Sequence, residues 1–165
     1  MPPERVLLVF HLAGQLAAIP ISGVERIAPM ADLARPPGMP SCFEGILNLA
    51  GIAVPVWRLD RLLQLPQRRP GLYSMLIVLK VVSGSRTAML VDRVTEILSV
   101  PESALLPMEA KDSFNGCAEA EMSVKGHVIH LLSPRRILLE QEREALAEFQ
   151  AMAQQRLRDC EPATL

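Results

Sequence analysis

Short apolar runs separated by glycine turns follow one another through the first 133 residues. Four pairs of these runs flank a turn, and each pair predicts a β-hairpin. The pairs are 6–12 with 16–21, 45–49 with 52–59, 75–82 with 86–91, and 117–124 with 127–132. Short strands and tight turns at this density are typical of an all-β sandwich or barrel, and not of alternating strands and helices.

The chain changes character after Ser133. Ser133-Pro134 is typical of a helix N-cap followed by proline at the first helical position. The segment 137–158 contains neither Gly nor Pro and is rich in Leu, Ala, Glu, Gln and Arg, so it predicts a C-terminal α-helix. Leu139, Leu146, Phe149, Ala153 and Leu157 would form one apolar stripe on this helix. Such a stripe fits packing on the helix's own domain or docking to a partner.

Two parts of the sequence are repeated. Residues 18–27 align with residues 88–97, at an offset of 70 residues, and both segments follow a predicted hairpin. The segment 51–63 aligns with 126–138 at an offset of 75 residues. A repeat of this length predicts two similar half-domains within one compact body. The segment 66–70, with proline at each end, marks the expected boundary between them.

Composition and charge exclude several classes of protein. Half of the residues are hydrophobic, which excludes a disordered chain. The net charge is −1, so there is no basic field to attract nucleic acid or an anionic membrane. No stretch reaches the roughly 18 consecutive apolar residues of a membrane span, and the N-terminus lacks the features of a signal peptide. Cys42, Cys117 and Cys160 are scattered, which favours reduced thiols in a cytoplasm.

No motif for catalysis or for cofactor binding stands out. Neither glycine-rich phosphate loop is present, and G-x-S-x-G and H-E-x-x-H are absent. His127 and His130 lie in a predicted strand, where an odd spacing sends two side chains to opposite faces. They therefore make a poor metal site. The sequence predicts no enzyme activity, no cofactor and no metal.

The segment 45–59 reads GILNLAGIAVPVWRL and resembles the signature of the CheW-like family, usually G-[VI]-x-N-x-R-G-x-[IV]-[IL]-P-[VI]-x-[DN]-L. Two further segments, 18–27 and 90–98, are similar to the A-[IL]-P-[IV]…V-x-E-[IV] and L-V-D-x-V-x-x-[VI] segments of that family. Residues 115–132 resemble its closing hairpin. The resemblance covers about residues 4–140, in order and at the right spacing.

The resemblance implies an all-β fold of two intertwined five-stranded SH3-like β-barrels, followed by the C-terminal α-helix at 137–158. One domain would span 4–140, with subdomain 1 at about 14–66, subdomain 2 at about 72–134 and the N-terminal strand shared. Each barrel should have its own core. Val9, Leu16, Ile19, Leu47 and Val54 are expected to fill one barrel, and Ile77, Leu79, Met89, Val91 and Ile129 the other.

The resemblance also implies a function. Such domains are non-catalytic adaptors that link chemoreceptors to a chemotaxis-type histidine kinase, in the cytoplasm and at membrane-associated receptor arrays. A groove between the barrels takes the cytoplasmic tip of the receptor, and one barrel binds the regulatory domain of the kinase. Nucleic acid and direct membrane insertion play no part. The matching receptor-binding positions are Val24, Arg26, Ile27, Asn48, Leu49 and Ala50, and the kinase-binding positions are Glu44, Gly45, Ile46 and Val56.

The kinase-binding segment is expected to carry an exposed apolar patch, so Ile46, Leu47 and Val56 should not all be core residues. A bulky residue in place of Gly45 is expected to weaken kinase binding and leave the fold intact, unless the φ of Gly45 is positive.

Three positions depart from the family pattern. The family usually has Arg where this chain has Ala50, Glu where it has Arg26, and an acidic residue where it has Arg58. In typical members the first two residues lie close enough to pair beside the receptor groove. Two matched changes predict a different receptor surface, as in an adaptor of a divergent pathway for surface motility or second-messenger control. A small-molecule-binding β-barrel is a third hypothesis.

Overall fold

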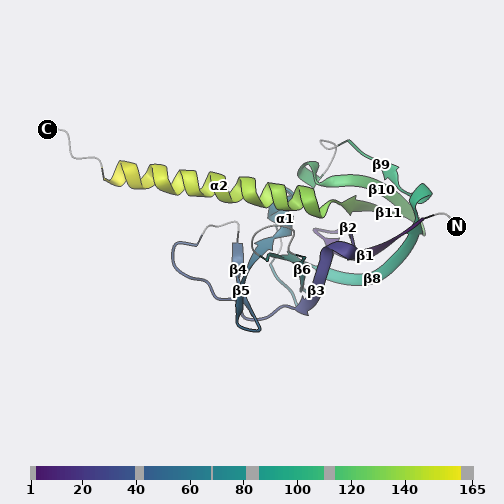
Figure 1. Cartoon of the computed structure of the whole chain (residues 1–165), viewed down its shortest axis with the longest axis horizontal. Helices are drawn as coiled ribbons and strands as arrows, with labels where there is room; N and C mark the ends of the chain where they lie inside the picture. Colours follow the sequence, from purple (N-terminus) through teal and green to yellow (C-terminus); the bar gives the residue numbers. More distant parts are fainter. Residues whose placement is uncertain (1–2, 40–42, 68, 81–85, 110–113, 161–165) are drawn as a thin grey trace.

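The computed structural model describes residues 3–39, 43–67, 69–80, 86–109 and 114–160. Its strands form two sheets, and a long C-terminal helix runs from the first sheet past the second (Figure 1). The strand order is β8-β1-β2-β11-β10-β9 in the first sheet and β3-β6-β7-β5-β4 in the second.

The first sheet consists of β1 (Glu4–Leu12), β2 (Gln15–Pro20), β8 (Arg93–Pro101), β9 (Leu106–Pro107), β10 (Ala118–Val124) and β11 (His127–Leu132). The second consists of β3 (Val24–Pro29), β4 (Phe43–Leu49), β5 (Ile52–Arg58), β6 (Met75–Leu79) and β7 (Ala88–Val91). The helices are α1 (Leu59–Leu62) and α2 (Pro134–Asp159), with short 3-10 turns η1 (Ile21–Gly23), η2 (Glu102–Ala104) and η3 (Phe114–Gly116). The all-β fold with one long C-terminal helix is confirmed.

The expected hairpins are confirmed, and three of them close through the same kind of turn. Ala13, Ala50 and Lys125 have φ between 49° and 51°, and the glycine that follows each of them has φ between 79° and 87°. Two consecutive positive φ values define the type I′ turn, whose twist matches that of the flanking strands. β6 and β7 also pair antiparallel, while the turn predicted at 83–85 lies outside the described residues.

The two sheets do not correspond to consecutive halves of the chain. All strands of the second sheet come from residues 24–91, whereas the first sheet takes its strands from 4–20 and 93–132. The chain crosses to the second sheet between β2 and β3 and returns between β7 and β8. The expected division into 14–66 and 72–134 is therefore wrong for the sheets, because each half supplies strands to both.

The sequence repeat is nevertheless present in the topology. Exchanging β1 to β5 with β6, β7, β8, β10 and β11, in that order, converts the strand order of one sheet into that of the other. The two parallel pairs, β2 with β11 and β5 with β7, correspond as well. The repeats have thus exchanged their first hairpins, which interlocks them. The two-residue β9 has no counterpart and gives the first sheet six strands, where five were expected.

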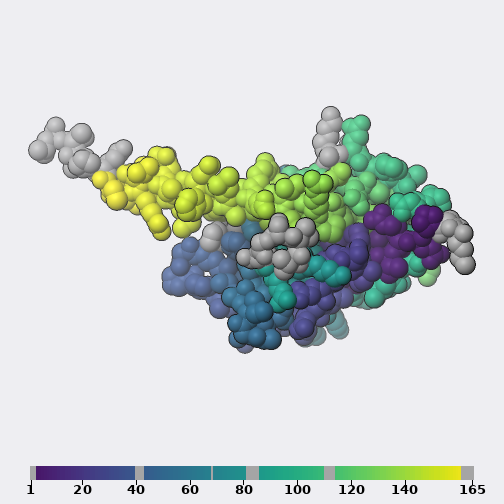
Figure 2. Space-filling model, viewed as in Figure 1, coloured from purple at the N-terminus to yellow at the C-terminus, as the bar shows by residue number. Residues whose placement is uncertain are grey.

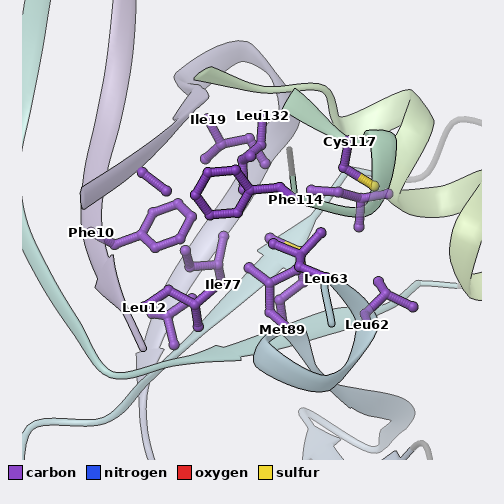
Figure 3. Packing of buried hydrophobic residues seen from close by; sticks show 14 of the residues in the cluster. Phe10, Leu12, Ile19, Leu62, Leu63, Ile77, Met89, Phe114, Cys117 and Leu132 are labelled. Atoms are coloured by element: carbon purple, nitrogen blue, oxygen red, sulfur yellow. The ribbon is translucent and has the colours of Figure 1, made fainter. Parts of the chain in front are cut away.

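The buried residues form three clusters rather than the two expected cores. Val9, Leu16 and Ile129 pack inside the first sheet, and Leu47 and Val54 inside the second. The largest cluster lies where both sheets meet the helices (Figure 3), and it includes Phe10 and Ile19 from the first sheet, Ile77 and Met89 from the second, and Leu62 of α1. Leu79 and Val91 also belong to this central cluster.

The central cluster exists because several strands are buried on both faces. In β6, Leu76 and Val78 face the second-sheet cluster, while Ile77 and Leu79 face the central cluster. Alternate residues of a strand point to opposite sides, so a strand between two cores appears as a continuous apolar run. The assignment of each strand to one barrel interior failed for this reason.

Helix α2 is anchored to the barrels by its N-terminal half, as far as Glu148. Ser133 caps it, as expected, with its Oγ accepting a hydrogen bond from the backbone N–H of Arg136 at 3.3 Å. Ile137 and Gln141 are buried against the barrels, and Glu148 pairs with Arg61 of α1 at 3.4 Å. The last turns of α2 extend beyond the barrels (Figure 2). The apolar stripe on this helix is exposed, so it does not pack on its own domain.

Candidate binding surfaces

The expected receptor-binding residues lie on the second sheet and differ in exposure. Arg26 of β3, Asn48 of β4 and Ala50 of the β4–β5 turn are exposed, and Ile27 and Leu49 are half-buried. Val24 is only 8% exposed and belongs to the central cluster. The structure therefore leaves five of the six side chains accessible to a partner, while Val24 supports the strand from inside.

The β4–β5 turn is fixed by its own residues. The Oδ1 atom of Asn48 accepts a hydrogen bond from the backbone N–H of Gly51 at 2.9 Å. Ala50 adopts a φ of 51°, in the left-handed region. The turn presents Ala50 as a small apolar side chain in solvent, where the family usually presents a guanidinium.

Arg26 lies on β3, which is one edge strand of the second sheet, and β4 is the other. Ala28 of β3 and Leu49 of β4 pack against the same interior cluster, so the sheet curves and its two edges approach each other. Within the part of the chain that the structure describes, Arg26 has no ion-pair partner, whereas the neighbouring Glu25 pairs with Arg86 at 3.0 Å. Among the described residues, this exposed part of β3 therefore carries a positive charge without an ion-pair partner.

The expected kinase-binding residues are less accessible. Val56 is fully buried in the second-sheet cluster and Leu47 is 7% exposed, so both are core residues. Ile46 is half-buried, and its backbone exchanges two hydrogen bonds with Ala34, at 2.8 and 2.9 Å. The preceding chain covers the β4 edge here, which is one way in which proteins protect an edge strand. Only part of the expected apolar patch is present.

Gly45 is buried for a steric reason. A Cβ atom at this position would lie 2.5 Å from Cβ of Leu33 and 3.0 Å from the carbonyl oxygen of Ala34. The φ of Gly45 is not positive, so the absence of a side chain is required by the close approach of the covering segment. Contrary to the expectation from the sequence, a bulky residue here should therefore disturb the fold.

Arg58 has acidic partners that the motif comparison did not reveal. Its guanidinium lies 3.1 Å from Oδ2 of Asp60 and 3.5 Å from Oε2 of Glu44, which also pairs with Arg35 at 3.0 Å. The hydrogen bond to Asp60 raises the pKa of Arg58 above its ordinary value, so the group stays charged. The Arg58-x-Asp60 spacing is the only sequence signal for this ion pair. The second partner, Glu44, comes from another strand, so no local pattern indicates it.

A groove of about 1010 Å³ runs between the base of α2 and the barrels. Sequence reasoning did not predict it, because its walls come from segments far apart in the chain. It is lined by Arg5, Pro20, Ser22, Gly23, Trp57, Lys80, Thr87, Glu119, Ser133, Pro134, Arg135, Leu138, Leu139, Gln141, Glu142 and Ala145. Three of these residues contain a buried polar atom without a hydrogen-bond partner among the described residues: Trp57 Nε1, Thr87 Oγ1 and Gln141 Nε2.

The thiols of Cys117 and Cys160 are both free, and they differ in environment. Cys117 is buried, and burial raises the pKa of its thiol to about 11. Cys160 is exposed at the end of α2, and Cys42 lies outside the described residues. No helix in the described part of the chain is both long and apolar enough to cross a membrane.

Two interlocked barrel-like sheets with a C-terminal helix define the fold class of this chain. The family model of the CheW-like domain matches residues 6–142. The chain therefore belongs to the CheW-like domain family, as its signature indicated.

Named relatives agree with this assignment. The chain is 27% identical to the chemotaxis protein CheW of Rhizobium meliloti over 143 residues, which cover 86% of this chain and 92% of that protein. It is 25% identical to the chemotaxis protein CheW of Thermotoga maritima over 137 residues, which cover 83% and 89% of the two chains. The crystal structure of the scaffolding protein TtCheW from Thermoanaerobacter tengcongensis superposes with a TM-score of 0.70 at 23% identity, covering 80% and 86%, and shows the shared fold.

Proposed function

We propose that this protein is a non-catalytic adaptor that links chemoreceptors to a chemotaxis-type histidine kinase. The match of the CheW-like model to residues 6–142 carries this proposal, because it includes every strand that builds the two interlocked sheets apart from the first residues of β1. An adaptor that holds two partners at once raises the effective concentration of each for the other. The protein would act in the cytoplasm, recruited to membrane-associated receptor arrays.

The receptor tip would contact the exposed part of β3 and the β4–β5 turn. Arg26, Asn48 and Ala50 offer their side chains there, and the half-buried Ile27 and Leu49 add apolar surface. Arg26 and Ala50 favour a second, finer version of the same function. A free positive charge and a methyl group replace the acidic residue and the arginine of typical members, so the native receptor would belong to a divergent chemosensory pathway.

The regulatory domain of the kinase would contact the outer side of β4. Ile46 is half-buried and can reach a partner, whereas the Glu44 side chain is only 11% exposed and would act by holding Arg35 and Arg58 in place. Gly45 and Val56 would act indirectly, since one makes room for the covering segment and the other fills the core. Replacing Ile46 with Ser should weaken kinase binding and leave receptor binding unchanged.

The adaptor role is tested with purified full-length protein, the regulatory domain of its cognate kinase and the receptor tip encoded with it. Isothermal titration should show binding of each partner and of both together. If the folded protein binds neither partner, the proposal is wrong.

The receptor surface is tested by the double change Arg26→Glu with Ala50→Arg. This variant should bind a typical receptor tip more tightly, by up to about a hundredfold, and the native tip more weakly. Kinase binding is the internal control and should not change. If neither tip responds to the double change, these residues do not contact the receptor.

A further inference from the structure

The outer face of α2 carries a row of large exposed apolar side chains, which we call the outer stripe. Leu139, Leu146, Phe149 and Leu157 are 55%, 58%, 67% and 64% exposed. At 3.6 residues per turn they fall within an arc of about 80° around the helix axis. The buried anchors Ile137 and Gln141 lie on the other side of the helix, so the stripe is not what holds α2 to the barrels.

The second half of the stripe lies on the part of α2 that leaves the barrels behind. From Phe149 to Asp159 this part is about 16 Å long at 1.5 Å per residue, and Figure 2 shows its end clear of the barrels. Helical segments this short are marginal in water by themselves. A continuous apolar row on such a segment marks an interaction surface.

We propose that the outer stripe is a dimer interface on which α2 of a second copy packs in the antiparallel direction. The spacings along the stripe from Leu139 to Leu157 are 7, 3 and 8 residues. Read from Leu157 to Leu139 they are 8, 3 and 7, so the pattern is nearly symmetric. Turning the second copy end for end therefore places its Leu157 against Leu139 and its Phe149 against Leu146. By symmetry the same contacts repeat, and every side chain of the stripe has an apolar partner.

Charge favours the same orientation. Glu142 falls within the arc of the outer stripe near the base of α2, and Arg156 lies about 20° outside that arc near the free end. Neither has an ion-pair partner within the described ranges. The antiparallel register brings Glu142 of each copy within about one helical turn of Arg156 of the other, close enough for long side chains to pair. A parallel pair would instead place Glu142 against Glu142 and Arg156 against Arg156.

The base of α2 is open to such a partner. Leu139 and Glu142 both line the rim of the groove beside the helix, so the free end of a second helix can lie along them. The contact from Leu139 to Leu157 is about 27 Å long. This places the interface at the small end of specific protein contacts, so the dimer should form in the micromolar range of concentration and dissociate on dilution.

Sedimentation velocity of the full chain tests the dimer over about 1 to 300 µM. The mass should double as the concentration rises. Leu146→Glu and Phe149→Glu should each weaken association at least tenfold, because a carboxylate would enter the apolar contact. The control Ala151→Glu adds the same charge to an exposed position on the opposite face of α2 and should associate like the unaltered protein. Circular dichroism checks that each variant remains folded.

A protein that stays monomeric over the whole range would overturn the proposal. A dimer that persists unchanged in both Leu146→Glu and Phe149→Glu would also overturn the proposal, because its interface would lie outside the outer stripe. If the protein is monomeric and Phe149→Glu abolishes kinase binding, the outer stripe contacts the kinase. That result would overturn the dimer proposal as well.

Cysteine cross-linking tests the orientation, in a Cys42→Ser background with copper phenanthroline as oxidant. In the antiparallel register Cys160 lies opposite Arg135 of the other copy, so Arg135→Cys should create a disulfide-linked dimer. The two Cys160 side chains lie about 36 Å apart, so they should not cross-link with each other. The control Arg135→Cys with Cys160→Ser should lose the link. Cross-linking through Cys160 alone would indicate a parallel pair and refute the register.

Discussion

Gly45→Ala is expected to destabilise the protein, although alanine is the smallest possible addition. The new Cβ would lie 2.5 Å from Cβ of Leu33 and 3.0 Å from the carbonyl oxygen of Ala34. The first distance is far below van der Waals contact, and both neighbours belong to the segment that covers β4. That segment is held by the two backbone hydrogen bonds between Ala34 and Ile46, so it cannot move away without lengthening them.

The magnitude follows from two costs. Overpacking a well-packed site costs roughly 1–3 kcal/mol. A displaced segment would also weaken the two Ala34–Ile46 hydrogen bonds, each with a net contribution of about 1 kcal/mol. The two costs are alternatives in part, because moving the segment relieves the clash. We therefore expect the free energy of unfolding of Gly45→Ala to fall by about 2–4 kcal/mol.

Urea denaturation followed by circular dichroism measures this change. The matched control is Gly71→Ala, because a Cβ at Gly71 meets no atom within 4 Å and should change stability by less than about 0.5 kcal/mol. If Gly45→Ala were as stable as the control, the steric reasoning would be refuted. If the prediction holds, a bulky residue at Gly45 cannot test kinase binding, since it would alter the fold first.

Four further outcomes can be measured on the same protein. Arg58→Ala should cost about 2–3 kcal/mol in urea denaturation, because it leaves the 4% exposed Asp60 without its guanidinium partner; an unchanged midpoint would contradict this. Ser133→Ala should cost about 1 kcal/mol by loss of the helix cap, and equal thermal unfolding would argue against that role. In the folded protein a thiol reagent should label the exposed Cys160 and spare Cys117, as mass spectrometry would show. Because the folded state holds the Cys117 proton up to about pH 11, compared with 9.0 for an ordinary thiol, stability should fall as the pH rises between these values. Cys117→Ala should remove this component of the pH dependence.

Local features of the fold could be predicted from the sequence because local residues determine them. The turn at Ala50-Gly51 needs two consecutive positive φ values, and glycine at the second position makes that possible. The cap at Ser133 and the proline after it mark the start of α2 in the same way. Each feature depends on fewer than about five neighbouring residues, so no knowledge of the tertiary structure was needed.

The assignment of strands to sheets could not be predicted, because it depends on contacts between distant segments. β1 pairs with β8, and Leu8 lies opposite Ile97 in this pair. Nothing near Leu8 in the sequence specifies that partner. The repeat indicated two similar halves, and consecutive halves are the simpler way to build two barrels. Apolar runs buried on both faces carry no alternation that would have revealed the exchange.

The candidate site residues show the same difference between what local sequence determines and what tertiary contacts determine. Arg26, Asn48 and Ala50 are exposed, as residues available to a partner should be. Gly45 and Val56 were assigned to a surface by their places in a signature segment, and a signature does not distinguish residues that shape a surface from residues that contact a partner. The segment around Leu33 and Ala34 covers Gly45, and Val56 fills the second-sheet cluster; both facts became known only from the structure.

The interlocked topology has a consequence for an adaptor. Both proposed partner surfaces lie on the second sheet, at its edge strands β3 and β4 and at the β4–β5 turn, whereas α2 follows the last strand of the first sheet. The pair between Arg61 and Glu148 ties α1, which directly follows β5, to α2. The central cluster joins the two sheets through residues such as Phe10 and Met89. A partner that binds either sheet is therefore in contact with a body that moves as one unit, and this rigidity would allow the proposed adaptor to hold its two partners in a fixed relation.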